Sequence, residues 1–250
     1  MSPIVAVSFK AYFGREQMRS WLARLGDTVV PAGVELALLP ALPWLPEVAD
    51  SLAGTGITWG AQDVAPLTTG AQTGAVTAGT LAELGCKYVE VGHAERHQIF
   101  HETAADTRQK IERLTEVGIT PLICVGELSR AATPDTAEQM ADELTALLAG
   151  LTPREVLVAY EPVWAIGAPA PAPASHVREV TSSLTRRLRD VNQPGRVLYG
   201  GAAGPGTLTD LTGSVDGVFL GRFAHDVSAL AAVMAEAAAP SFQSAFLDRN

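Results

Sequence analysis

Residue types that transfer protons or carry charge follow several short apolar runs of the chain. The run "IVAVSF" leads to Lys10, "KYVEVG" leads to His93 and Glu95, and "EVLVAY" leads to Glu161. A carboxylate in such a place can accept a proton, and an ammonium group or an imidazole can stabilise negative charge. Glycines at the ends of other runs let the backbone approach an anion closely. The residues at the ends of all these runs are Ser8, Lys10, Gln62, His93, Glu95, Cys124, Glu127, Glu161, Gly200, Gly201, Gly221 and Arg222.

Eight apolar, strand-like runs recur along the chain, with helix-like segments between them. The clearest helical segments run from Arg15 to Gly26, from Pro134 to Gly150 and from Ser175 to Asp190. Strands that are apolar throughout and alternate with helices predict a parallel sheet covered by those helices. The runs are IVAVSF, VELALL, GITWGA, KYVEVG, ITPLIC, EVLVAY, RVLYGG and GVFLG.

Eight strand–helix units in 250 residues predict one α/β domain, residues 1–250, folded as a closed eight-stranded parallel (β/α)8 barrel. An open, doubly wound sheet is the alternative, but no Gly-rich dinucleotide fingerprint follows the first strand. Barrel enzymes place their chemistry at the carboxyl ends of the strands. The fold would therefore gather the proton-transferring residues at one rim.

Composition narrows the classes of function. With 47% hydrophobic residues the chain can bury a large core, and its net charge of −9 with thinly spread basic residues predicts no nucleic-acid or anionic membrane partner. No signal peptide or membrane-spanning run is recognisable, which predicts a cytoplasmic protein. Cys86 and Cys124 lie in or beside apolar runs, so we expect buried thiols rather than a disulfide.

Five segments together carry a family resemblance. "VEVGHAERHQIF", "ICVGE", "AYEPVWAIG", "RVLYGG" and "VDGVFLG" resemble the triosephosphate isomerase family in order and spacing over nearly the whole chain. The resemblance implies a TIM barrel that interconverts a ketose phosphate and an aldose phosphate by proton transfer, without cofactor or metal. It also implies a homodimer, because Gln72, Thr73 and Gly74 match the tip of the loop that enters the neighbouring subunit in the family.

The resemblance assigns the proton transfer to four residues. Glu161 would take a proton from the carbon beside a carbonyl, and Lys10 and His93 would stabilise the enediolate that forms. Glu95 matches the family carboxylate that pairs with this lysine. Each residue also has a plainer interpretation. Glu161 could be a strand-end glutamate paired with a helix, and His93 could be a hydrogen-bonded core histidine. Lys10 could be a surface amine, and Glu95 could be a helix cap.

Further residues match supporting positions of the family. Glu127 would steady Trp164 of the lid, Cys124 would pack beside the base rather than act as a nucleophile, and Tyr199 would support the lid. The substrate phosphate would be held by backbone N–H groups at glycine turns. These glycines are Gly167, Gly200, Gly201 and Gly221.

Four departures from the family pattern concern substrate binding and the lid. Ser8 in "SFK" replaces an asparagine, and Ala202 in "YGGA" replaces a serine whose hydroxyl binds phosphate or latches the lid. Arg222 replaces the second glycine of the last turn, and would be strained if that position is left-handed. Arg222 could bind the phosphate or shift the substrate along the groove and so determine substrate choice; a surface ion pair is the alternative.

The fourth departure is the segment "APAPAPA" from Ala168 to Ala174, which takes the place of a polar lid. Its three prolines restrict φ and predict a stiffened lid over Glu161 that would rotate chiefly between Ala165 and Ala168. Intact acid–base residues beside altered binding residues suggest a paralogue. The predicted function is an isomerase of triose phosphates, with a tetrulose phosphate such as erythrulose phosphate as the alternative substrate, and a non-catalytic barrel that binds a phosphorylated metabolite as a second alternative.

Overall fold

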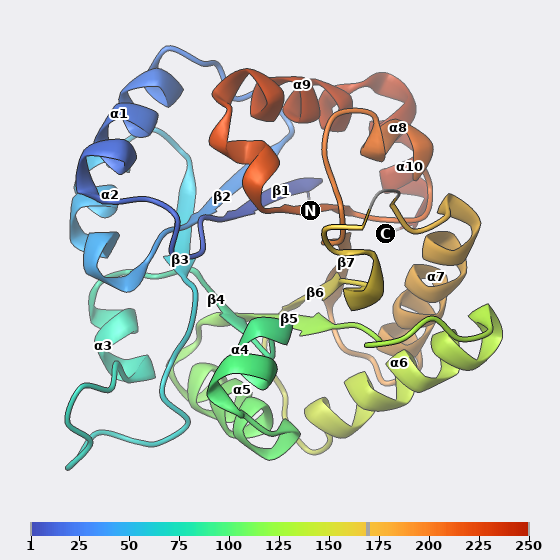
Figure 1. The fold of residues 1–250 in the computed structure, drawn as a ribbon, viewed down its shortest axis with the longest axis horizontal. Coiled ribbons are helices and arrows are strands. Elements are labelled where there is room, and N and C mark those ends of the chain that lie inside the picture. The colour runs from blue at the N-terminus through green and yellow to red at the C-terminus, as the bar shows by residue number, and fades with distance from the viewer. Residues whose placement is uncertain (1, 169–170, 250) are drawn as a thin grey trace.

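The computed structural model describes residues 2–168 and 171–249. Its parallel strands form a closed barrel in chain order, and β8 pairs with β1 to complete it. The helices lie outside the strands as a ring, as Figure 1 shows. The predicted (β/α)8 barrel is therefore confirmed, and the open sheet is wrong. The strands are β1 (Ile4–Ser8), β2 (Glu35–Leu39), β3 (Thr58–Ala61), β4 (Tyr88–Val91), β5 (Thr120–Val125), β6 (Val156–Tyr160), β7 (Gly195–Tyr199) and β8 (Gly217–Leu220).

The three helices expected from the sequence are present, with ends within two residues of those expected: α1 (Arg15–Gly26), α6 (Thr133–Leu148) and α7 (Ala174–Asp190). The other helices are α2 (Leu45–Leu52), α3 (Ala78–Glu83), α4 (Ala94–Phe100), α5 (Ala104–Val117), α8 (Thr207–Asp210), α9 (Val227–Ala238) and α10 (Pro240–Arg249), with 3-10 turns η1 (Leu42–Trp44), η2 (Val163–Ala165) and η3 (Arg222–His225). In the described part of the chain no single helix is long and apolar enough to span a bilayer, and only α9 with α10, bent by 59°, passes that test as a pair.

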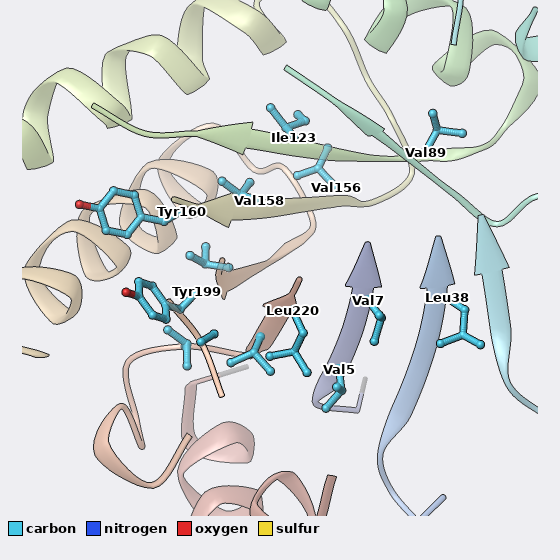
Figure 2. Close-up of a cluster of buried hydrophobic side chains, with 14 of the residues drawn as sticks. Val5, Val7, Leu38, Val89, Ile123, Val156, Val158, Tyr160, Tyr199 and Leu220 are labelled. Atoms are coloured by element: carbon cyan, nitrogen blue, oxygen red, sulfur yellow. The ribbon is translucent and has the colours of Figure 1, made fainter. Parts of the chain in front are cut away.

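The strands are apolar throughout because both of their faces are buried. In β1, Val5 and Val7 point outward and pack beneath the helices, while Ile4 and Ala6 fill the barrel interior. Figure 2 shows the outward layer continuing across the other strands, for example through Val158 of β6. Alternating inward and outward residues are both excluded from water, so no polar alternation marks the strands.

A network of charged side chains closes the barrel at the amino-terminal ends of the strands. Arg196 is 3% exposed and donates to Glu35 Oε2 and to Glu155 Oε1, each at 2.8 Å. Tyr88 Oη donates to Glu35 Oε1 at 2.6 Å. Because these charges are paired with one another, they serve to join the strands at this end of the barrel. The polar groups available for chemistry lie at the opposite end.

The segment between β3 and α3 extends away from the barrel (Figure 1). It contains Gln72, Thr73 and Gly74, of which Gly74 has a φ of +87°. The projection leaves this loop accessible to another chain. The homodimer predicted from the sequence stays a prediction.

Candidate active site

One pocket of about 760 Å³ opens at the carboxyl ends of the strands and collects the predicted site residues. The four acid–base residues line it together with the residues assigned to substrate and phosphate binding. The lid and support residues Glu127, Trp164, Cys124 and Tyr199 are absent from its described lining. The predicted residues that line the pocket are Ser8, Lys10, His93, Glu95, Glu161, Gly167, Gly200, Gly201, Ala202, Gly221 and Arg222.

Glu161 follows β6, and the residue is only 6% exposed. Burial and the nearby charge of Glu90 raise its pKa to about 8, against the lowering effect of Lys10. Its Oε2 lies 3.3 Å from Nε2 of His93 and forms no hydrogen bond within the described residues. The ionised form of this carboxyl group has an unpaired oxygen and, because its pKa is raised, a high affinity for a proton, so it is well suited to accept a proton from carbon.

His93 is the N-cap residue of α4, and this position fixes its tautomer. Its Nδ1 accepts a hydrogen bond from the backbone N–H of Glu95 at 3.1 Å. Burial and the charge of Lys10 lower the pKa of His93 to about 4, so the ring is neutral near pH 7. Because Nδ1 is an acceptor, the single ring proton lies on Nε2, which is 3.2 Å from Lys10 Nζ. His93 therefore presents a neutral N–H donor to the pocket.

Lys10 is the pocket cation that lies beside His93. Its Nζ donates to Glu95 Oε1 at 2.7 Å. Burial opposes the charge on Lys10, but the hydrogen bond to Glu95 and the charges of Glu161 and Glu90 outweigh burial and raise its pKa. Its backbone has a φ of +49°, a conformation that costs free energy in residues other than glycine and is often found at functional sites. Lys10 thus stays charged beside the neutral imidazole.

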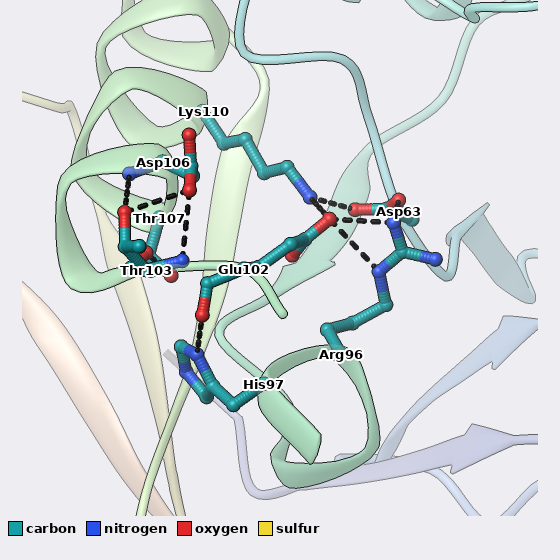
Figure 3. Close-up of polar contacts among 8 residues, drawn as sticks. All are labelled: Asp63, Arg96, His97, Glu102, Thr103, Asp106, Thr107 and Lys110. Carbon is teal, nitrogen blue, oxygen red and sulfur yellow. Dashed lines mark hydrogen bonds and ion pairs between the residues drawn. The ribbon is translucent and has the colours of Figure 1, made fainter. Parts of the chain in front are cut away.

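A buried ion network anchors the helix that His93 caps (Figure 3). Lys110 of α5 is 1% exposed, and its Nζ lies 2.5 Å from both Asp63 Oδ1 and Glu102 Oε1. Arg96 of α4 joins the same two carboxylates, with Nη2 2.8 Å from Asp63 Oδ2. The network ties α4 to α5 and to the chain after β3, so it holds the start of α4 in place. Sequence analysis missed it, because its members are distant in the chain.

A second buried cluster supports the segment after Glu161. Trp164 Nε1 donates to Glu127 Oε1 at 2.5 Å, which is the pairing that the sequence predicted. Tyr160 Oη donates to the same carboxylate at 3.1 Å, and His176 Nε2 lies 3.2 Å from Glu127 Oε1. His176 was not predicted, because nothing in the sequence links the start of α7 to this carboxylate. Glu127 thus joins the end of β6, the turn η2 and helix α7.

Two of the predicted support residues, Cys124 and Tyr199, are packed in the barrel. Cys86 and Cys124 are both free and buried, as the sequence predicted. Burial raises the pKa of the Cys124 thiol well above its usual range, so it stays protonated in the barrel interior. Tyr199 lies against Gly201, where a Cβ would come within 2.5 Å of the Tyr199 hydroxyl.

The part of the pocket predicted to hold the phosphate differs in two ways from the sequence-based expectation. The N–H of Gly200 already donates to Tyr160 O at 2.8 Å, so it is not a free donor for phosphate. Arg222 begins η3 and is not among the described residues with positive φ. The backbone strain expected for a left-handed arginine at this position is therefore absent. Arg222 is exposed, lines the pocket and forms no ion pair with any other residue in the described ranges. Gly167, with a φ of +74°, and Gly201, Ala202 and Gly221 surround the same end.

Glu90 is a buried carboxyl that sequence analysis missed. It lies on β4, is 3% exposed, and its Oε2 accepts a hydrogen bond from Ser8 Oγ at 2.8 Å. Its Oε1 lies 4.0 Å from Nε2 of His93. The available signal was its place in "KYVEVG": two residues after Tyr88, it shares the inward face of the strand.

The pocket thus combines a carboxylate base, a neutral imidazole donor and a cation in contact with one another. Such a set can remove a proton from carbon beside a carbonyl and stabilise the charge that forms on the carbonyl oxygen. No group of three or more His, Cys, Asp or Glu side chains among residues 2–168 and 171–249 is arranged to hold a metal ion.

Comparison with known proteins identifies the family of this chain. The triosephosphate isomerase family model matches residues 3–237. The chain is 40% identical to L-erythrulose-1-phosphate isomerase from Pectobacterium atrosepticum, over 93% of this chain and 95% of the relative. It is 36% identical to triosephosphate isomerase from Thermus thermophilus, over 92% and 97% of the two chains. A triosephosphate isomerase from Ralstonia nicotianae is 39% identical over 80% and 86%.

The fold and these similarities define the class of protein first: an isomerase built on a (β/α)8 barrel. The chain belongs to the triosephosphate isomerase family. The resemblance seen in its sequence motifs is therefore confirmed over nearly the whole chain.

Proposed function

We propose that this isomerase moves a carbonyl group by one carbon in a small phosphorylated ketose, by proton transfer through an enediolate. Glu161 removes the proton from the carbon beside the carbonyl and returns it to the former carbonyl carbon. Lys10 and His93 stabilise the negative charge on the carbonyl oxygen, and the oxygen protons are redistributed between the two carbons. Atoms balance without an oxidant, a reductant or a cofactor.

The observation that carries this proposal is the separation of 3.3 Å between Glu161 Oε2 and His93 Nε2 within the pocket that Lys10 also lines. A base and an electrophilic donor so close can act on two adjacent atoms of one small substrate. A barrel that only binds a metabolite would not need a buried carboxylate with its pKa raised to about 8 beside a neutral imidazole.

The first candidate substrates are dihydroxyacetone phosphate and glyceraldehyde 3-phosphate, in line with the triosephosphate isomerases among the relatives. A four-carbon ketose phosphate is the second candidate, favoured by the relative named for L-erythrulose 1-phosphate and by the unusual Ser8–Glu90 pair. We also propose a homodimer, with the projecting loop around Gln72 and Thr73 reaching the other subunit.

The test is a turnover assay of the full chain with dihydroxyacetone phosphate and with L-erythrulose 1-phosphate, run in deuterated water. We expect the protein to turn over at least one of these two substrates. Deuterium from the solvent should then enter the carbon beside the carbonyl. Glu161→Gln should lower kcat by roughly two to four orders of magnitude, the usual contribution of a positioned base. The exposed Glu138→Gln serves as control. A Glu161→Gln variant within a few-fold of the wild type, or a wild type inactive on both substrates, would remove the proposal.

A further inference from the structure

Ser8 and Glu90 form a polar pair inside the barrel. β1 and β4 are not neighbours in the sheet, so the 2.8 Å bond from Ser8 Oγ to Glu90 Oε2 crosses the interior. Apolar side chains that fill the same interior include Ala6, Leu39 and Phe219. A carboxyl group placed among them costs free energy unless hydrogen bonds compensate for the lost water.

Glu90 neither takes nor returns a proton in the reaction derived above, although its charge contributes to the raised pKa of Glu161. Its hydrogen bond to Ser8 points to a second role. Burial raises its pKa to about 7, with the Ser8 hydrogen bond and the charge of Lys10 acting in the opposite direction. The interior layers of such barrels are ordinarily filled by branched apolar side chains. A leucine or valine would fill this position without the desolvation cost.

The pair lies beneath the reacting end of the pocket. Ser8 lines the pocket, and Glu90 Oε1 is 4.0 Å from Nε2 of His93. The hydroxyl proton of Ser8 is donated to Glu90, so the serine oxygen can only accept a hydrogen bond from the pocket side. The pair is therefore set to receive a substrate hydroxyl group near the carbon from which Glu161 takes its proton.

The two candidate substrates differ at that carbon. In the three-carbon ketose phosphate, the carbon that loses the proton carries a second hydrogen. In a four-carbon ketose 1-phosphate, it carries a hydroxymethyl group in place of that hydrogen. Proton removal there and return to the former carbonyl carbon shifts the carbonyl by one carbon, so the product is again a ketose. The larger substrate thus adds one carbon and one hydroxyl donor at the reacting end.

We propose that Ser8 and Glu90 bind the terminal hydroxymethyl group of a four-carbon ketose 1-phosphate, and so determine the choice of this substrate over the triose phosphate. The inference rests on the proposed isomerase function and selects between its two substrates. Ser8 accepts the hydrogen bond from the terminal hydroxyl, and Glu90 holds the serine in the accepting orientation. With the triose phosphate the accepting oxygen stays without a donor from the substrate, and such a loss discriminates strongly between substrates.

The experiment compares kcat/KM for L-erythrulose 1-phosphate and for dihydroxyacetone phosphate in the full chain. The wild type should prefer the four-carbon substrate. Glu90→Val and Ser8→Ala should each lower the ratio of the kcat/KM value for the four-carbon substrate to that for the triose phosphate by about ten-fold or more. Tyr88→Phe is the matched control: it alters an inward residue of the same strand at the other end of the barrel and should leave the ratio unchanged.

The inference is overturned if the wild type prefers the triose phosphate, or if the ratio stays within about three-fold of the wild-type value in the variants. If Glu90→Val fails to fold, the ratio measured for Ser8→Ala alone tests the inference, because this variant removes a single oxygen atom. Failure of the proposed function has a different signature, since it would appear as indifference of both activities to Glu161→Gln or as no wild-type turnover of either substrate.

Discussion

Gly200 faces the side chain of Glu161 so closely that a Cβ at this position would lie 2.6 Å from Glu161 Cγ and 2.8 Å from Oε1. Gly200 follows β7 and Glu161 follows the neighbouring β6, so the contact crosses two adjacent strand ends. The absence of a side chain at Gly200 therefore leaves the room that Glu161 occupies. A family resemblance would assign this glycine to the phosphate, whereas its N–H is bonded to Tyr160 O.

Gly200→Ala should displace Glu161 and lower kcat by about ten- to a thousand-fold, because a shift of about 1 Å in a catalytic group can cost about a hundred-fold. The fold should survive, since the change is confined to the rim. Gly26→Ala, in α1 with open space around its Cα, is the control and should be silent. Steady-state kinetics with circular dichroism checks the prediction. An unchanged kcat would show that Glu161 is not held by this contact.

Lys10→Met should lower kcat/KM by roughly two to four orders of magnitude, because the pocket loses its positive charge at the developing oxyanion. His93 should also become easier to protonate, since the charge of Lys10 contributes to its lowered pKa. Lys87→Met is the matched control, because Lys87 pairs with Glu35 at the opposite end of the barrel. If Lys10→Met loses affinity for inorganic phosphate and keeps kcat, Lys10 serves in binding instead.

The strands and helices could be predicted from the sequence because burial on both faces leaves continuous apolar runs and the main helices carry ordinary start and stop signals. Glu90 was missed for the same reason. In a strand buried on both faces no alternation shows which side is inward, and a glutamate there resembles one at a surface. The register of β4 with β5, which aligns Glu90 with Leu122, shows its place.

The clusters around Lys110 and Glu127 could not be predicted either, because each depends on how distant helices pack against the barrel. The start of the predicted lid lies among the described residues. Ala165 is buried and Ile166 to Ala168 are exposed, while Pro169 lies outside the described residues, so the effect of three prolines on closure stays a prediction.

Glu90→Gln should change the pH dependence of stability. The pKa of Glu90 is raised from its ordinary 4.5 to about 7 in the folded state, so the folded protein binds this proton more tightly than the unfolded chain does. Stability is then greatest below pH 4.5 with respect to this group, and is lost as the pH rises through about 7.

Removing the ionisable group should therefore reduce the stability lost between pH 5 and pH 8 by about 3 kcal/mol at most. Urea unfolding of wild type and variant at the two pH values measures the difference, with the exposed Glu138→Gln as control. Glu161 contributes in the same direction, since its pKa is also raised, and it limits how flat the variant profile can become. An identical pH profile in wild type and Glu90→Gln would mean that Glu90 ionises as readily in the folded state as in the unfolded chain.

Arg222→Gly should lower the affinity for the phosphate group of the substrate without changing which substrate is preferred. Arg222 lines the same pocket as Ala202, where the hydroxyl expected from the family resemblance is missing. Its planar guanidinium can bind a phosphate through two hydrogen bonds. Its backbone is not left-handed, so the change relieves no strain that could offset the loss. The phosphate is common to both candidate substrates, and the loss should be common as well.

We expect KM for both sugar phosphates, and the inhibition constant of inorganic phosphate, to rise by about ten-fold, the worth of a charged hydrogen bond, with kcat nearly unchanged. Arg222→Lys keeps the positive charge but loses the planar guanidinium that can donate two parallel hydrogen bonds. Its KM values and inhibition constant should therefore lie between those of the wild type and Arg222→Gly. A changed ratio of the two kcat/KM values would move substrate selection from Ser8 and Glu90 to Arg222. If the KM values and the inhibition constant are all unchanged, Arg222 does not contact the phosphate, and the compensation for Ala202 must come from the backbone around Gly201 and Gly221.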